Sequence, residues 1–229
     1  MECVAWFPER KGFLSQQKLA GMNPVMLDSE RVCRHTAMSA AGPPARGIPK
    51  QETIMNTPGI IIRDEKESDA SIITGITVAA FADMEISDHT EQFVITALRS
   101  AGALSMSLVA EVDGRVVGHI AFSPVEISDG TRDWYGLGPV SVRPEYQRRG
   151  IGKALIREGL ARLKSMGARG CCLVGHADYY PRFGFENVPG MVVAGVPAEA
   201  FFALSFDGNM PRGDVRFHEA FLAKGERKP

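Results

Sequence analysis

The segment Val140–Gly152 reads Val-Ser-Val-Arg-Pro-Glu-Tyr-Gln-Arg-Arg-Gly-Ile-Gly, and it predicts a strand, a short loop and the start of a helix. Its first, β-branched residues are typical of a strand, and apolar residues at helical spacing follow its last glycine. Gly150 and Gly152 favour a sharp turn that lets an anion approach several backbone N–H groups. The unpaired N–H groups of a helix start favour negative charge, and Arg148 and Arg149 add guanidinium groups suited to phosphate oxygens. The segment therefore predicts a binding loop for a pyrophosphate.

Two other phosphate-binding loops do not fit the spacing of this segment. A Walker A loop needs a Ser or Thr after its Gly-Lys pair, but Ala154 follows Gly152-Lys153, and the first glycine of that motif is also missing. A dinucleotide-binding Gly-x-Gly-x-x-Gly motif needs a glycine where Leu155 stands. The loop therefore predicts neither a P-loop NTPase nor an NAD-dependent enzyme.

The order Gln-Arg-Arg-Gly-Ile-Gly at 147–152 resembles the acetyl-CoA loop of the GCN5-related N-acetyltransferase (GNAT) family, Gln/Arg-x-x-Gly-x-Gly/Ala after the fourth strand. The later segment Tyr180–Phe185, Tyr-Pro-Arg-Phe-Gly-Phe, is similar to a second motif of that family. The resemblance covers about residues 60–188 and implies an α/β fold of the α+β type. Its central sheet is expected to be mixed and mostly antiparallel, with one parallel β-α-β unit and flanking helices. The implied activity is transfer of the acetyl group of acetyl-CoA to a primary amine, with no metal.

The resemblance also implies which residues bind the donor and act on it. In this family the splayed fourth strand pairs with the pantetheine arm of acetyl-CoA. The residues that this carry-over assigns to acetyl-CoA are Val140, Ser141, Val142, Gln147, Arg148, Arg149, Gly150, Ile151, Gly152 and Lys153. Tyr180 matches the family's acid tyrosine, with Tyr179 as its neighbour. A phenol of pKa ~10 can protonate a departing thiolate whose conjugate acid has a pKa of ~8.5 when the geometry is good. Backbone N–H groups near Val140 are the candidate oxyanion donors.

The sequence leaves the general base and the acceptor open. No carboxylate lies on the expected strand 134–142, where many relatives in the family carry one. The candidates are Glu126, Glu85, His89, His176 and water. Because that carboxylate is missing, a non-catalytic acyl-CoA-binding or sensing module of the same fold is an alternative, as is an enzyme that uses a longer acyl donor. The acceptor is a small molecule or a protein, and a homodimer is left open.

Composition limits the remaining function classes. The chain has 229 residues, of which 45% are hydrophobic, and a formal net charge of −1, so we expect a full core and no bulk binding to nucleic acid or to a membrane. No apolar run approaches the ~20 residues that span a bilayer, and no signal peptide is evident. The spacing of Cys3, Cys33, Cys171 and Cys172 does not suit zinc, which favours reduced core thiols and a cytoplasmic protein. One further set of acidic residues is interpreted as keeping loops solvated, with attraction of a cationic amine as the alternative: Glu85, Asp88, Glu91, Asp129 and Asp133.

The chain divides into an extension and one domain. Residues 1–54 are broken by prolines and glycines and lack a sustained period, so we expect a disordered extension, or a translation start placed upstream of Met55. Residues 55–229 are expected to form the GNAT domain. Ser68 or Asp69 is the expected cap of its first helix. The elements expected in the domain are strands at 59–64, 104–112, 115–127, 134–142, 170–174, 200–206 and 215–221, a strand beginning at Phe185, and helices at 68–81, 90–100, 151–166 and 178–183. Asp113-Gly114 is the expected hairpin turn, and Gly138-Pro139 predicts a bulge.

Overall fold

The computed structural model describes residues 59–84 and 87–225. The expected extension at 1–54, Cys3, Cys33 and the candidate base Glu85 lie outside the described residues. The elements in chain order are β1 (Ile60–Asp64), α1 (Ala70–Phe81), α2 (Glu91–Ser100), β2 (Met106–Val112), β3 (Arg115–Ile127), β4 (Trp134–Val142), α3 (Ile151–Ser165), β5 (Gly170–Val174), β6 (Met191–Val192), β7 (Phe201–Ser205) and β8 (Gly213–Phe217). Short 3-10 helices lie at Glu67–Asp69, Pro144–Tyr146, Tyr180–Phe183, Ala198–Ala200 and Glu219–Leu222.

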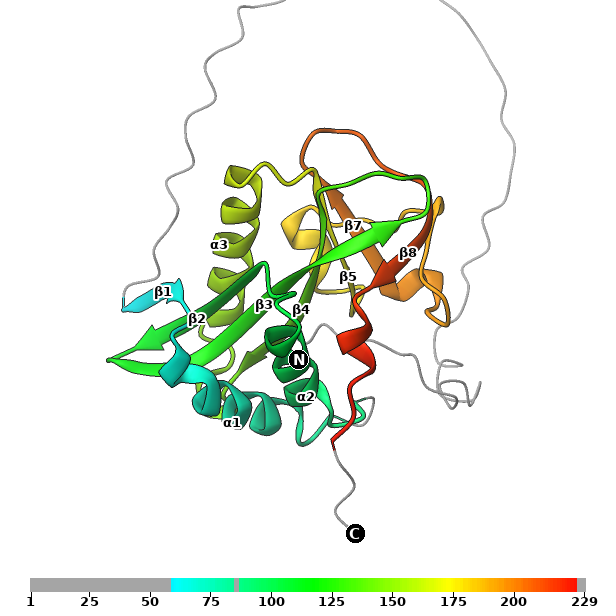
Figure 1. Cartoon of the computed structure of the whole chain (residues 1–229). Coiled ribbons are helices and arrows are strands. Elements are labelled where there is room, and N and C mark those ends of the chain that lie inside the picture. Colours follow the sequence, from blue (N-terminus) through cyan, green and yellow to red (C-terminus); the bar gives the residue numbers. More distant parts are fainter. Residues whose placement is uncertain (1–58, 85–86, 226–229) are drawn as a thin grey trace, which may run out of the picture. The chain divides into compact units, whose positions relative to one another are not determined.

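The strands form one mixed sheet (Figure 1). Along the order β1-β2-β3-β4-β5-β7, only β4 and β5 are parallel, and α3 connects them. This confirms the expected mostly antiparallel sheet with a parallel β-α-β unit. The strand β8 pairs antiparallel with the far end of β3 and parallel with β6, a second parallel pair that the sequence does not predict.

The hairpin and the bulge are confirmed. Asp113 and Gly114 both have positive φ, 50° and 71°, as a tight two-residue hairpin turn requires. In the β3–β4 pairing, Ile120 lies opposite Val140 and Phe122 opposite Leu137, so two residues of β4 face one residue of β3. The extra residue lies at 138–139, where the sequence predicts it.

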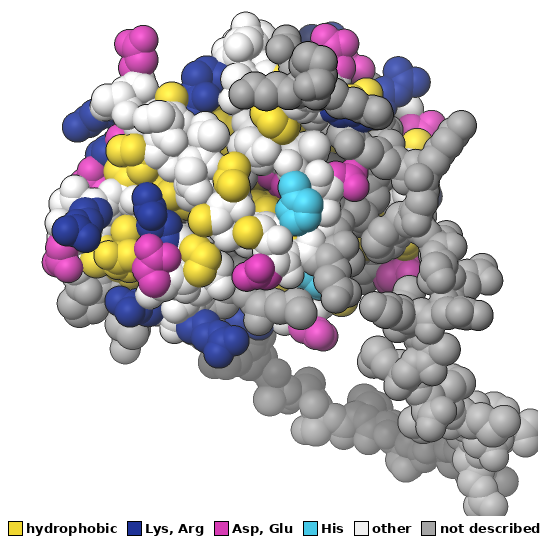
Figure 2. Space-filling model, turned by 90° about the horizontal axis from the view of Figure 1, so that it is seen from below, with side chains coloured by type: hydrophobic (Ala, Val, Ile, Leu, Met, Phe, Trp, Pro, Cys, Tyr) yellow, Lys and Arg dark blue, Asp and Glu magenta, His cyan; other side chains and the backbone are white. Residues whose placement is uncertain are grey.

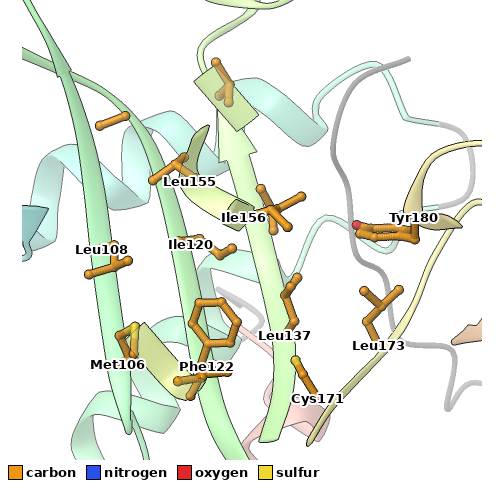
Figure 3. Close-up of a cluster of buried hydrophobic side chains, with 14 of the residues drawn as sticks. Met106, Leu108, Ile120, Phe122, Leu137, Leu155, Ile156, Cys171, Leu173 and Tyr180 are labelled. Atoms are coloured by element: carbon orange, nitrogen blue, oxygen red, sulfur yellow. The ribbon is translucent and has the colours of Figure 1, made fainter. Parts of the chain in front are cut away.

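The helices cover opposite faces of the sheet. Leu155 and Ile156 of α3 pack into the core cluster that contains Ile120 and Leu137 (Figure 3). A Cβ on Gly159 of α3 would lie 2.4 Å from the Phe122 ring, so the glycine lets the helix approach β3 closely. On the other face, the side chain of Thr77 in α1 lies 3.3 Å from that of Ser141 in β4, measured between hydroxyl oxygens.

Several details of the sequence-based expectation are wrong at element ends. The helical spacing of Ile151, Leu155 and Leu163 predicts that Met166 also faces the core, but α3 ends at Ser165 and Met166 is 57% exposed. The same spacing places Arg162 on the outward face of the helix, but its side chain is partly buried and pairs with Glu158 and Asp64. The expected cap Asp69 is buried, and its carboxylate accepts hydrogen bonds from Arg63 and from Lys66 N–H instead of capping α1.

The segment after β5 also differs from the expectation. The expected helix at 178–183 is only the 3-10 helix Tyr180–Phe183, which the left-handed Gly184 ends after one turn. Phe185 is buried but starts no strand, and the chain makes only an isolated bridge between Glu186 and Ala203. The expected strand at 215–221 is β8 at Gly213–Phe217, followed by a 3-10 helix.

The two adjacent cysteines of β5 behave as expected. Cys171 and Cys172 are unpaired and buried, and they lie in different core clusters because successive strand residues point to opposite faces. Over residues 59–84 and 87–225, no helix is long and apolar enough to cross a membrane.

Candidate functional site

The site is built where β4 and β5 part. Their parallel pairing runs from Trp134–Gly170 to Gly136–Cys172, and β5 continues in pairing with β7 up to Val174. Beyond Gly136, β4 goes on to Val142 in pairing with β3. Within the described part of the chain, the edge of β4 that faces away from β3 therefore has no strand partner beyond Gly136, just before the bulge. Such an edge can pair with an extended ligand.

The side chains of the three predicted donor-binding residues on β4 point into the protein. Val140 and Val142 belong to the core cluster on the α3 face, and the hydroxyl of Ser141 meets Thr77 on the other face. All three side chains are therefore occupied by packing, and what they offer a ligand at the strand edge is backbone N–H and C=O groups.

The loop after β4 has the geometry of an anion-binding turn. Arg148 and Gly150 both adopt left-handed backbone conformations, with φ of 62° and 81°. Gly150 is the N-cap of α3 and, as a glycine, supplies no side-chain cap to the N–H groups of that helix start. Alternation of left- and right-handed residues directs successive N–H groups toward one point, where an anion can be held. The expectation of a sharp turn at Gly152 is wrong, since Gly152 is buried within the first turn of α3.

The remaining residues of the loop fix its position and add positive charge to it. The Gln147 side chain donates to the Val142 carbonyl at 3.1 Å, which ties the loop to the end of β4. Arg149 stacks over the Tyr146 ring at 5.3 Å, and Arg148, Arg149 and Lys153 are all exposed. Figure 2 shows the molecule from below relative to Figure 1, and at the left of that face Lys and Arg side chains lie among acidic and hydrophobic ones. The three exposed cations of the loop place positive charge locally at the start of α3, although the whole chain has a net charge of −1.

Tyr180 follows β5, the strand from which β4 parts. It is fully buried at the start of its 3-10 helix, and its ring packs against Phe185 and Phe202 with centroids 6.0 and 6.3 Å away. A Cβ on Gly175 would lie 2.3 Å from the Tyr180 ring, so this glycine admits the ring at the end of β5. Figure 3 shows the Tyr180 hydroxyl end directed toward β4. The tyrosine is therefore held rigidly and aimed across the diverging strands.

The candidate bases are scattered. Glu126 is exposed on β3 and lies opposite Arg216 of β8, past the last residue of β3 that pairs with β4. It is therefore far along the sheet from Val140, which lies opposite Ile120. His89 is exposed between α1 and α2, and its backbone N–H donates to Ser87. His176 is partly buried just after β5, and its carbonyl accepts from Tyr179 N–H at 3.1 Å. Of these residues, only His176 stands beside Tyr180.

The structure contains a buried polar network that the sequence analysis missed. His119 of β3 has no exposed surface, and its Nε2 lies 2.8 Å from the Ser107 hydroxyl. Ser107 in turn donates to Glu65, which also accepts from Arg99 at 2.8 and 3.0 Å. Burial lowers the pKa of His119 to about 4, against the opposing attraction of Glu65. Burial alone would raise the pKa of Glu65, but the hydrogen bonds from Arg99 and Ser107 outweigh it and lower that pKa.

The donor sets of the described residues do not suggest a metal centre. Among residues 59–84 and 87–225, no group of three or more His, Cys, Asp or Glu side chains is arranged to hold an ion. The geometry instead combines a strand edge, an anion-binding loop and an aimed phenol, which suits an extended phosphate-bearing ligand such as an acyl-CoA.

Comparison with known proteins gives the same class. A family model described as an acetyltransferase (GNAT) domain matches residues 104–187. The Escherichia coli K12 protein named "Uncharacterized N-acetyltransferase YjhQ" is 38% identical over 128 residues, covering 54% of this chain and 68% of that protein. A GNAT family acetyltransferase from Brucella melitensis, solved in complex with acetyl-CoA, is 50% identical with a TM-score of 0.64, covering 71% of this chain and 97% of that one. Escherichia coli YhbS, solved with CoA, is 31% identical with a TM-score of 0.64, covering 72% and 93%.

The fold and the matches define an acyltransferase. More narrowly, the chain belongs to the GNAT family of N-acetyltransferases, as the Gln147–Gly152 and Tyr180–Phe185 motifs predict.

Proposed function

We propose that this chain transfers the acetyl group of acetyl-CoA directly to a primary amine. The observation that carries the proposal is the parting of β4 from β5 beyond Gly136, next to a loop whose left-handed Arg148 and Gly150 open onto the start of α3. The solved relatives from Brucella melitensis and Escherichia coli contain acetyl-CoA and CoA, which supports the same donor here.

The donor-binding roles divide between backbone and charge. The backbone of Val140, Ser141 and Val142 pairs with the amide groups of the pantetheine arm. The N–H groups from Arg148 through Gly152 receive the pyrophosphate, with Ile151 at the first position of α3. The exposed cations Arg148, Arg149 and Lys153 add charge around it, and Gln147 holds the loop in place.

The transfer needs two further groups. A backbone N–H near Val140, fixed by the bulge, stabilises the oxyanion that forms when the amine nitrogen attacks the thioester carbonyl. When the carbon–sulfur bond breaks, Tyr180 gives its proton to the thiolate. The products are an amide and free CoA.

Two linked measurements test the proposal. Thermal unfolding with acetyl-CoA, CoA, ATP and NAD comes first: at 100 times the dissociation constant, acetyl-CoA and CoA should stabilise the fold by ~2.7 kcal/mol, while ATP and NAD should not. Release of CoA from acetyl-CoA is then followed with a panel of primary amines. Stabilisation without release by any amine supports the non-catalytic acyl-CoA-binding module instead, and a response to ATP or NAD alone contradicts the donor.

A further inference from the structure

The outer face of α1 carries no charge. The twelve residues Ala70–Phe81 contain no Asp, Glu, Lys or Arg, although 23% of the whole chain is charged. Ile73 and Ile76 on the inner face are buried in a core cluster, but Ile72 and Val78 are 38% and 49% exposed. A helix on the surface of a protein ordinarily presents charged and polar side chains to water. The outer face of α1 is therefore typical of a surface that meets another protein.

Gly75 stands in the middle of this outer face. A Cβ on it would meet nothing within 4 Å, so no contact within the described part of the chain requires a glycine there. Its backbone is helical, and a glycine inside a helix lowers stability relative to alanine. What a glycine does provide at an open helical position is room for another backbone to come close.

The neighbouring helix α2 extends the uncharged surface. It packs beside α1, and the two helices share a core cluster (Figure 1). Of its two charged residues, Glu91 is buried and Arg99 is bound to Glu65. A helix is about 10 Å wide and rises 1.5 Å per residue, so the two outer faces together offer about 330 Å² of flat area. Stable interfaces bury about 800 Å² of accessible surface per partner, so contact through this surface predicts a weak association that depends on concentration.

The pattern of α1 is complementary to itself when two copies run antiparallel. Ile72 lies three residues before Gly75, and Val78 lies three residues after it. A twofold axis at the glycine therefore brings Ile72 of one copy beside Val78 of the other. The ends of the helix match as well, because the exposed Lys66 lies nine residues before Gly75 and the exposed Asp83 eight residues after it. Opposite charges thus meet at both ends of the antiparallel pair.

We propose that α1 forms the contact between two copies of this chain, with Gly75 where the two helices cross. The uncharged middle of the face offers nothing to a strongly charged partner, whereas its ends carry opposite charges placed evenly about the glycine. A second copy satisfies both features. The anion-binding loop leads into α3, which covers the opposite face of the sheet, so each copy keeps its donor site open. This contact goes beyond the proposed acetyl transfer and does not depend on it.

Sedimentation velocity of the full chain, from about 2 to about 400 μM, tests the contact. The parent protein should change from monomer to dimer over this range, as a weak interface requires. Gly75→Lys places two like charges at the crossing, so it should weaken association at least tenfold. Ala161→Lys is the matched control, because it adds the same charge at an exposed position of α3 on the opposite face and should associate like the parent.

The melting temperature separates this contact from damage to the fold. Measured at the lowest concentration, where the monomer prevails, Gly75→Lys should raise it by about 2 °C, because lysine is the better helix former. The added stabilisation by CoA should equal that of the parent. A fall in the melting temperature would show that another segment of the chain covers the face, and it would overturn the proposal.

A charge exchange tests the antiparallel arrangement. Within one copy, Lys66 and Asp83 lie at opposite ends of α1, more than about 20 Å apart, so they cannot pair with each other. Lys66→Glu and Asp83→Lys should each weaken association about threefold, because like charges then meet at both ends. The double variant should return to within twofold of the parent.

Three results would overturn the dimer contact. They are a parent protein that stays monomeric throughout the range, a Gly75→Lys protein that associates like the parent, and a double variant no better than the single ones. Failure of the protein to acetylate any amine would leave the contact standing, since sedimentation needs no turnover.

Discussion

At the scale of single residues, the buried ring of Tyr180 packs in the core, and the role proposed for it belongs to its hydroxyl. Phenylalanine keeps the ring contacts with Phe185 and Phe202 and removes only the hydroxyl. Because general acid catalysis is worth about 10²- to 10⁴-fold, Tyr180→Phe should lower kcat by at least ~10²-fold. Its affinity for acetyl-CoA, from isothermal titration, should stay within a few-fold. A fully active variant would remove Tyr180 from the mechanism.

His119 should make stability depend on pH. Its pKa is about 4 in the folded protein against an ordinary 6.5, so the unfolded chain binds the proton more readily. This stability is fully present above pH 6.5 and is lost as the pH falls toward 4, at up to about 1.4 kcal/mol per pH unit. Urea unfolding from pH 7.5 to 4.5 measures the slope. His119→Gln should flatten that slope; an equal slope would assign the acid sensitivity to other groups.

Residues in short linear motifs can be predicted from the sequence more readily than residues whose surroundings come from distant parts of the chain. Tyr180 and Gly150 stand in short linear motifs, so their places could be predicted. The surroundings of His119 and Glu91 depend on tertiary contacts: Ser107, which joins His119 to the network, bonds a carboxylate 42 positions away. The sequence marks Glu91 only as one acidic residue among several, and its burial appears only once α2 is placed on the sheet.

At the scale of elements, the turn from β4 into α3 depends on one backbone conformation. Gly150 has a φ of 81°, and a Cβ there would meet nothing within 4 Å, so a larger residue suffers from the left-handed backbone rather than from a clash. Gly150→Val should raise the dissociation constant for CoA at least tenfold. Gly208 is a matched control, since it has the same φ of 81° and equally open surroundings. Gly208→Val should lose comparable stability yet bind CoA normally; equal CoA affinity in both variants would contradict the role of the loop.

Local patterns predicted the elements whose causes are local. The turn at Asp113-Gly114, the bulge at 138–139 and the start of α3 each follow from residues within a few positions. The error at Phe185 has a distant cause. Phe185 has the composition of a strand start, yet β7 takes the edge of β5 and leaves that segment a single bridge.

At the scale of the whole molecule, β5 contributes to two of the core clusters, one on each of its faces. Cys171 points into the cluster under α3, and Cys172 into the cluster that includes Trp134 and Val215. Burial raises the pKa of both thiols, so neither presents a reactive thiolate in the folded state. The two thiols therefore report separately on the two faces of one strand.

If the two faces unfold as one unit, both thiols should react with N-ethylmaleimide at the same slow rate, limited by exposure of β5. Acetyl-CoA at 100 times its dissociation constant should then slow both reactions about 100-fold, because labelling requires a state that cannot hold the ligand. Two variants separate the rates when labelling is followed by mass spectrometry. One retains only Cys171 and the other only Cys172, and Ala replaces the remaining cysteines in each. Labelling of one thiol that stays fast with acetyl-CoA would show that its face opens without releasing the donor, and hence that the site is independent of that half of the core.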